Sequence, residues 1–340
     1  MSTVAANAFT DASGGNTATI NGYTPGPGNM VGINKIINGA MDIAQRGTSF
    51  ATASTGAYSL DRFQWVQSGV GVVTISQQTD SPSNNEFQNS LRITVTPTAD
   101  TTIAAGDIYN IQQQIEGFNS RDLIGRTFTL SFWVRSAKTG THCVAFVNNG
   151  TGSPDRSYIL EYTVSVANTW EYKTVTVSGG LITAGTWNWT NGSGVTVCFA
   201  LAAGSTFQTT AGAWQTGNFR STSNQVNCLD TVGNIFAITG VQLEAGSAAS
   251  PFEHRPYGTE LALCQRYYEK YLVTVGTTTI YPATPAWLAW KVTKRASPTV
   301  TTTPDSGSGA VYTAYGPEGA YQAVVNSVGS GATVIASIEL

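Results

Sequence analysis

Short runs in which hydrophobic and polar residues alternate recur along most of the chain. In Thr127–Ser136 every second residue from Phe128 to Val134 is hydrophobic, a period of two that is typical of a β-strand with one buried face. Similar runs, separated by Gly, Asn and Ser, are Val70–Gln77, Ser90–Thr96, Ile159–Val164 and Trp170–Val177. About eight or more such strands, with no long helical pattern between them, predict an all-β fold: an antiparallel jelly-roll β-sandwich over residues 34–257.

One segment has a helical period instead. Thr259 is placed to cap a helix from Glu260 to Tyr271. Its hydrophobic residues, at spacings of three, four and three, are Leu261, Cys264, Tyr268 and Tyr271. They form one stripe, which we expect to pack on the chain's own sandwich rather than on a subunit axis. Residues 258–272 are therefore predicted to be a connecting helix.

The two ends of the chain differ from this middle part. Residues 1–33 are rich in Gly, Asn, Thr and Ala and hold one acid, Asp11. Such a segment cannot build a core, so we expect an extended arm that orders against a partner, with an unstructured tail as the alternative. Residues 273–340 return to a β pattern of about five strands and predict a small C-terminal β-domain with little core for its size.

The composition of the chain limits the classes of partner that it is expected to bind. Charged residues make up 11% of the chain and the net charge is −3, with Lys and Arg scattered singly. No basic stripe is present to neutralise phosphates, so nucleic acid is excluded as an expected partner. No run approaches about 18 apolar residues, so no membrane insertion is expected. The N-terminus lacks a secretion signal, and we expect folding in the cytoplasm where the chain is made.

Catalytic patterns are missing from the sequence. We find no P-loop, dinucleotide fingerprint or GxSxG elbow, and the acidic residues are isolated. His142 and His254 lack metal-ligand spacing and are interpreted as structural. The cysteines are far apart, at positions 143, 198, 228 and 264; a disulfide is possible but not indicated. The chain is therefore predicted to have no catalytic residue, no metal site and no cofactor, and not to be an enzyme.

The aromatic residues are more informative. Trp187 and Trp189 flank Asn188 and should share one face, and Trp214 follows in a stretch rich in Gly, Thr and Gln. Indole faces stack on the C–H faces of sugar rings, and amides bind hydroxyl groups. These three tryptophans are our candidate glycan-binding residues. For each alone, burial in the core or in an interface is the more common fate.

Several stretches resemble a known group of proteins. They are Gly15–Pro25, Asn34–Gly47, Tyr58–Phe63, Phe236–Ser247, Pro251–Pro256, Glu260–Lys270 and Arg295–Val300. Taken in this order, they resemble bacteriophage tail-fibre and other virion appendage proteins, in which an N-terminal arm leads into a carbohydrate-binding-like sandwich through an "N-x-I-I-N-G" strand. Within them, Asp61 and Arg62 could form a local ion pair, and the alternation Gln242–Glu244 is that of an edge strand.

This resemblance implies a virion protein, assembled in the host cytoplasm and commonly a homotrimer. The expected function is a structural subunit of a fibre or appendage on the tail, collar or head that contributes to host attachment. Its expected partners are copies of itself and other virion proteins through residues 1–33, and a host-surface glycan is a further candidate. A dedicated glycan-binding receptor-binding protein is the alternative. A polysaccharide depolymerase is a distant one, because no carboxylate pair is recognisable.

Overall fold

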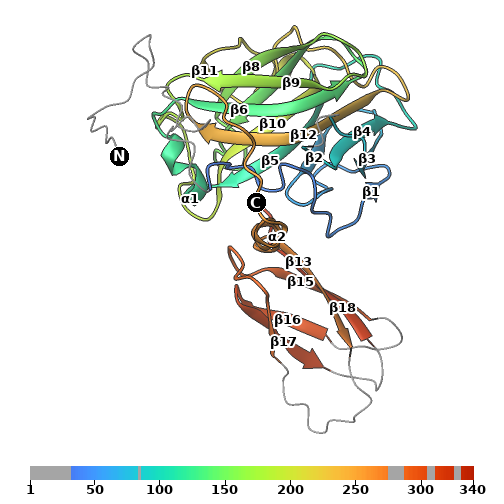
Figure 1. The fold of residues 1–340 in the computed structure, drawn as a ribbon, viewed down its shortest axis with the longest axis vertical. Helices are drawn as coiled ribbons and strands as arrows, with labels where there is room; N and C mark the ends of the chain where they lie inside the picture. The colour runs from blue at the N-terminus through green and yellow to red at the C-terminus, as the bar shows by residue number, and fades with distance from the viewer. Residues whose placement is uncertain (1–31, 83–85, 275–286, 305–310, 325–330) are drawn as a thin grey trace, which may run out of the picture.

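Two six-stranded antiparallel sheets packed face to face form the main body of the chain (Figure 1). The computed structural model describes residues 32–82, 86–274, 287–304, 311–324 and 331–340. Sheet 1 contains, in spatial order, β1 (Ser49–Phe50), β3 (Val73–Gln78), β4 (Ser90–Val95), β12 (Ile235–Ala245), β6 (Phe128–Ser136) and β9 (Glu171–Val177). Sheet 2 contains β11 (Trp214–Thr216), β8 (Arg156–Val164), β7 (Gly140–Val147), β10 (Ser193–Ala203), β5 (Ile108–Glu116) and β2 (Gln64–Gln67).

The chain passes repeatedly from one sheet to the other, which confirms the predicted jelly-roll sandwich. Strand β5 is followed by α1 (Gly117–Ser120) and η1 (Arg121–Leu123), which lead into β6 of the opposite sheet. A later turn, η2 (Ser205–Phe207), lies between β10 and β11. The strands predicted at residues 70–77, 90–96, 127–136, 159–164 and 170–177 correspond to β3, β4, β6, β8 and β9.

The core lies between the sheets and follows the period of two. In β6 the side chains of Phe128, Leu130, Phe132 and Val134 are fully buried. Phe132 makes edge contacts with Tyr162 and Phe199 of sheet 2, at ring-centroid distances of 5.1 and 5.0 Å. Burying such rings supplies most of the favourable free energy of a sandwich.

The outer face of sheet 2 is covered as well, so every residue of β10 is buried. Small residues on this face, among them Cys143, Cys198 and Ala200, form a cluster against which Phe219 packs. All four cysteines are buried and free. Cys143 and Cys198 therefore act as small hydrophobic residues in sheet 2.

The opening segment of the sandwich lies against β12. The Asn34 side chain donates to the carbonyl of Val241 (3.1 Å) and accepts from the amide of Leu243 (3.1 Å). A Cβ on Gly39 would lie 2.2 Å from the Val241 carbonyl oxygen, so only glycine fits there. The "N-x-I-I-N-G" motif thus fastens the start of the sandwich to the strand that closes it.

The prediction of an edge strand at Gln242–Glu244 is wrong. Strand β12 lies in the middle of sheet 1, between β4 and β6. Gln242 and Glu244 are polar because their buried side chains hold the exit of the sandwich: Glu244 accepts from the amide and hydroxyl of Ser250, and Gln242 accepts from the amide of Glu253 (2.7 Å). Buried polar side chains are tolerated when such partners satisfy them.

The helix is shorter than predicted and ends earlier. It is α2 (Tyr257–Gln265), with Pro256 at its N-cap position and Thr259 inside it. Cys264 packs with Ile37 and Ile43, so the helix lies against its own sandwich, as expected. Tyr268 begins a strand, because its backbone pairs with Ser337 far along the chain, and this long-range pairing overrides the local helical period.

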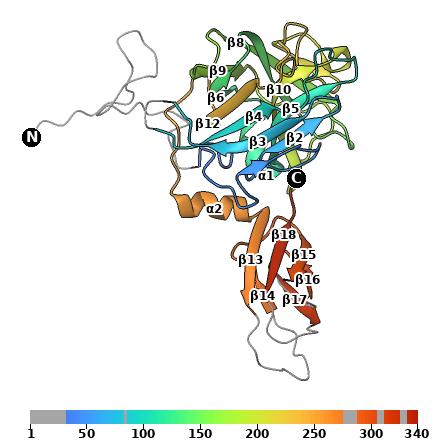
Figure 2. The same cartoon turned by 90° about the vertical axis from the view of Figure 1, so that its right-hand side faces the viewer.

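A second β-unit follows the helix and lies beyond it from the sandwich (Figure 2). One three-stranded sheet contains β13 (Tyr268–Thr274), β18 (Gly331–Ser337) and β15 (Thr299–Pro304). The other contains β14 (Trp287–Ala289), β17 (Gly319–Val324) and β16 (Val311–Gly316), of which β16 was not predicted. In the described part of this unit the buried hydrophobic cluster is small: Trp290, Ala320, Val334 and Ala336.

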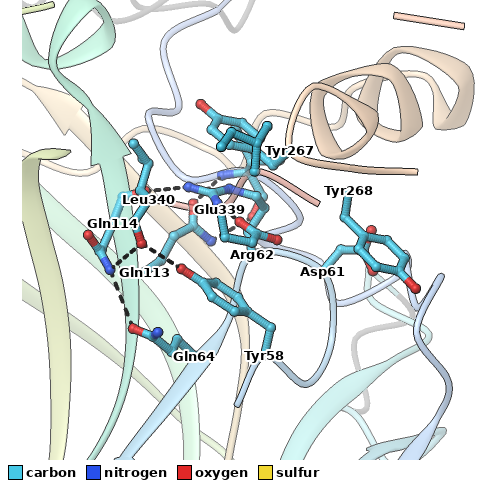
Figure 3. Close-up of polar contacts among 12 residues, drawn as sticks. Tyr58, Asp61, Arg62, Gln64, Gln113, Gln114, Tyr267, Tyr268, Glu339 and Leu340 are labelled. Carbon is cyan, nitrogen blue, oxygen red and sulfur yellow. Dashed lines mark hydrogen bonds and ion pairs between the residues drawn. The ribbon is translucent and has the colours of Figure 1, made fainter. Parts of the chain in front are cut away.

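The two units meet at a junction rich in charged side chains (Figure 3). Arg62 is fully buried there. Its guanidinium pairs with Glu339, donates to the carbonyl of Gln114 (2.6 Å) and lies 3.6 Å from the centre of the Tyr267 ring. The expected ion pair between Asp61 and Arg62 does not form, because the two neighbouring side chains serve different partners.

Asp61 and Glu116 hold further contacts of this junction. Asp61 accepts from the backbone amide and the side chain of Gln45, which also donates to the Tyr268 carbonyl (2.9 Å). Burial raises the pKa of Asp61 to about 6. Glu116 accepts from Arg266 at two nitrogens (2.7 and 2.9 Å) and from the Tyr267 hydroxyl (2.8 Å). These contacts join the C-terminal unit to the sandwich.

Candidate carbohydrate-binding surfaces

The three tryptophans proposed from the sequence come together in space. The rings of Trp187 and Trp189 stack with centroids 5.2 Å apart and an interplanar angle of 11°. Trp214, on β11, meets Trp187 edge-on at 5.6 Å. The segment between β9 and β10 therefore folds back onto the edge of sheet 2.

These rings are largely committed to contacts within the protein. All three are partly buried and pack against the main core. The indole N–H groups of Trp187 and Trp214 donate to the carbonyls of Ala184 (2.8 Å) and Gly180 (2.9 Å). Because Trp187 and Trp189 stack on each other, each has one face fewer for a ligand. Their role in glycan binding stays a prediction.

A second aromatic surface lies on the outer face of sheet 1. Trp133 of β6 and Tyr172 of β9 are opposite each other in the strand register, and their ring centroids are 5.5 Å apart. The Tyr172 side chain is 46% exposed, and Trp133 is half-buried. They line a groove of about 450 Å³ together with Ser131, Gly240, Ser250 and Phe252. We call this the sheet 1 groove.

One end of the sheet 1 groove is built from Phe87 and the exit segment of the sandwich. Phe252 meets Phe87 edge-on at 5.0 Å, and the His254 ring lies 5.7 Å from Phe87. His254 Nε2 lies 3.4 Å from Glu86 Oε1. This end therefore places a carboxylate and an imidazole beside apolar ring surface.

Gly240 lets the rings of the groove approach the sheet. It lies at the irregularity of β12 between Thr239 and Gln242 and has a φ of +60°. A Cβ at this position would lie 2.6 Å from the Phe87 ring and 3.1 Å from the Trp133 ring. A glycine is required both for this backbone conformation and for the space.

The sheet 1 groove was missed in the sequence, although a signal was present. Trp133 falls on the polar side of the alternating run 127–136, and Tyr172 does the same in 171–177. A large aromatic residue on the outward face of a strand departs from the usual pattern. This departure identifies Trp133 and Tyr172 as unusual one at a time. That the two residues lie side by side on neighbouring strands is seen only in the folded structure.

The two histidines occupy different environments. His142 is buried, its ring stacks on Tyr162 at 5.6 Å, and burial lowers its pKa. His254 is exposed at the groove and paired with Glu86. Among the described residues, no three His, Cys, Asp or Glu side chains gather in a way that could hold a metal ion. Within the same ranges, no helix is long and apolar enough to cross a bilayer.

Comparisons with known proteins identify similar solved structures. No protein-family model and no curated protein matches the chain. The enzymatically active domain of bacteriophage CBA120 tailspike protein 4 is similar at 18% identity and a TM-score of 0.34, over 63% of this chain and 22% of the tailspike chain. A putative sugar binding protein from Bacteroides thetaiotaomicron is similar at 12% identity and a TM-score of 0.36, over 63% of this chain and 100% of the other.

A third similar structure is a family 11 carbohydrate-binding module from Clostridium thermocellum, in complex with a mixed-linked β-1,3-1,4 tetrasaccharide. It matches at 9% identity and a TM-score of 0.34, over 60% of this chain and 99% of the module. All three TM-scores are below 0.5. The function of this chain is therefore argued from its own residues.

Proposed function

We propose that this chain is a carbohydrate-binding component of a bacteriophage fibre or other virion appendage, and that the sheet 1 groove is its glycan site. The observation that carries the proposal is the partly exposed Trp133–Tyr172 pair in a groove with polar groups at its margins. Sugar rings present C–H faces that stack on such aromatic rings, and their hydroxyl groups bind side chains such as Ser131, Ser250 and Glu86.

The virion setting is supported by the ordered sequence resemblances that span residues 15–300. Their contacts also favour a second candidate, a purely structural subunit, because Asn34, Gln242, Glu244 and Arg255 all hold the sandwich together. The two candidates differ in one respect. Only a glycan-binding component should lose ligand when the groove is altered without loss of fold.

The test uses the whole chain with Trp133→Ala or Tyr172→Ala, screened on a glycan array and then measured by titration calorimetry. Stacking contacts are individually weak, so one site should bind with a Kd in the millimolar to high micromolar range, roughly −4 to −6 kcal/mol. Each variant should weaken binding by at least about tenfold, which is about 1.4 kcal/mol.

Tyr257→Ala is the matched control, because Tyr257 is a 65% exposed tyrosine on α2, outside the groove. It should leave the affinity unchanged. If Trp133→Ala binds normally but Trp187→Ala does not, at an unchanged melting temperature, the site belongs to the tryptophan cluster. If no glycan binds the unaltered chain, the structural candidate replaces the proposal.

A further inference from the structure

Two arginines converge on a single carboxylate beside the sheet 1 groove. Asp80 accepts from Arg92 of β4 (2.5 Å) and also pairs with Arg135 of β6. The indole N–H of Trp170 donates to the other oxygen of Asp80 at 3.2 Å. The side chains of Arg92, Arg135 and Asp80 are 22%, 24% and 34% exposed. Solvent therefore reaches this group.

The group carries excess positive charge. Two guanidinium groups and one carboxylate leave a net charge of +1. Within the described residues, Asp80 is the one acidic residue with which Arg92 and Arg135 form ion pairs. The Nε atoms of both arginines are buried without a hydrogen-bond partner there. An anionic ligand would balance this charge, and a guanidinium binds a carboxylate through two parallel N–H groups.

The positive group is continuous with the groove. Arg135 and Trp133 are on the same strand and the same face, two residues and about 6.7 Å apart. Ala237 of β12 pairs with Arg92 on one side and with Arg135 on the other, so both arginines point from the outer face of sheet 1. A sugar ring stacked on Trp133 and Tyr172 would place a ring substituent within reach of Arg135.

We infer that the sheet 1 groove selects acidic glycans, and that Arg135 and Arg92 bind the carboxylate of a uronic or similar sugar residue while Trp133 and Tyr172 stack on its ring. This inference rests on the proposed function of the groove. A phosphate-rich polymer fits less well, because one net positive charge matches one carboxylate and Glu86 lies at the opposite end of the groove.

The experiment compares oligogalacturonate with the same oligosaccharide after reduction of its carboxyl groups, by calorimetry on the whole chain. The unaltered chain should bind the acidic form about tenfold more tightly, and the preference should shrink in high salt. Arg135→Gln should abolish this preference and leave the affinity for the reduced form unchanged. Asp80→Asn, which raises the local charge to +2, should increase the preference.

Arg156→Gln is the control for loss of one positive charge, because Arg156 lies on β8 of sheet 2. It should leave the preference intact.

Equal affinity for both forms of the sugar, or equal losses of affinity for both forms in Arg135→Gln, would overturn the selection of acidic glycans while leaving the glycan site itself in place. Preference for a sulfated oligosaccharide over the uronate would overturn the carboxylate assignment. Failure of both forms to bind, with the unaltered chain also silent on a glycan array, would instead remove the proposed function.

Discussion

At the scale of single residues, polar and glycine positions decide how the sandwich is closed and where a ligand can bind. Asn34 and Gly39 fasten the first segment to β12, and Gly240 opens space on the same strand for the rings of Phe87 and Trp133. The importance of Asn34, Gly39 and Gly240 comes from backbone geometry and from buried hydrogen bonds, whose loss costs about 1–3 kcal/mol each.

We predict that Gly240→Ala destabilises the chain by about 2–4 kcal/mol and weakens glycan binding. A side chain at a φ of +60° is strained, and its Cβ would collide with the Phe87 ring. Denaturant unfolding followed by tryptophan fluorescence measures the stability, and calorimetry measures the binding.

Gly233→Ala separates the two causes, because Gly233 has a φ of +92° and a Cβ added there would meet nothing within 4 Å. Its free energy of unfolding should fall only by the cost of backbone strain, about 1 kcal/mol, and it should bind glycan normally. Equal losses of stability for the two variants would contradict the proposed collision with Phe87.

At the scale of elements, the C-terminal unit is attached to the sandwich by charged side chains. Glu339 follows β18 and pairs with both Arg62 and Arg46, whose guanidinium also lies 3.7 Å from the centre of the Tyr268 ring. Arg62 is 1% exposed on its side chain and Glu339 is 8% exposed. Removing one partner of a buried pair leaves the other charge without compensation.

We therefore predict that Glu339→Gln destabilises the junction by about 3 kcal/mol. Hydrogen exchange should show faster exchange at β13 and β18, while the amides of β5 and β10 stay protected. Glu318→Gln is the control, since Glu318 is exposed in the turn before β17. Unchanged protection of β13 and β18 in Glu339→Gln would show that the attachment depends on other contacts, such as those of Glu116 with Arg266.

At the scale of the whole molecule, the sandwich and the C-terminal unit differ in the size of their hydrophobic cores. The sandwich buries a large cluster of hydrophobic residues. The buried hydrophobic cluster in the described part of the C-terminal unit contains four residues, Trp290, Ala320, Val334 and Ala336. A unit with so little core gains stability when it is covered by other copies.

From this difference, together with the homotrimer that the sequence resemblance implies, we predict that the chain is a homotrimer. Light scattering coupled to size exclusion should give three times the mass of the 35.8 kDa chain at micromolar concentration. A monomer of 35.8 kDa that stays folded under these conditions would contradict the prediction.

The role of the N-terminal arm is a separate prediction, which concerns residues outside the described ranges. Gly32 and Asn34 donate backbone hydrogen bonds to Glu253, so a deletion should stop at residue 31. The shortened chain should keep its melting temperature, since the contacts of the sandwich remain, but fail to join virions. Replacement of residues 1–31 by a Gly/Ser stretch of equal length is the control for length alone. Assembly of the shortened chain into particles would place the attachment elsewhere.

The sequence by itself determined the all-β class, the jelly-roll strands and the presence of one helix. It did so because a strand with one buried face must alternate hydrophobic and polar residues, and this requirement is visible within a few positions. The run Phe128–Val134 is the clearest example: Phe128, Leu130, Phe132 and Val134, at every second position, are all fully buried in β6.

Only the tertiary structure decided which strands are neighbours and which side chains meet. Tyr268 leaves the helix because it pairs with Ser337, and Trp133 meets Tyr172 because β6 pairs with β9. Arg92 and Arg135 share Asp80 although they are 43 positions apart in the sequence. Contacts of this kind join residues that are distant along the chain, and no local period records them. The strands could therefore be predicted from the sequence, whereas the groove they form appears only when the sheets are assembled.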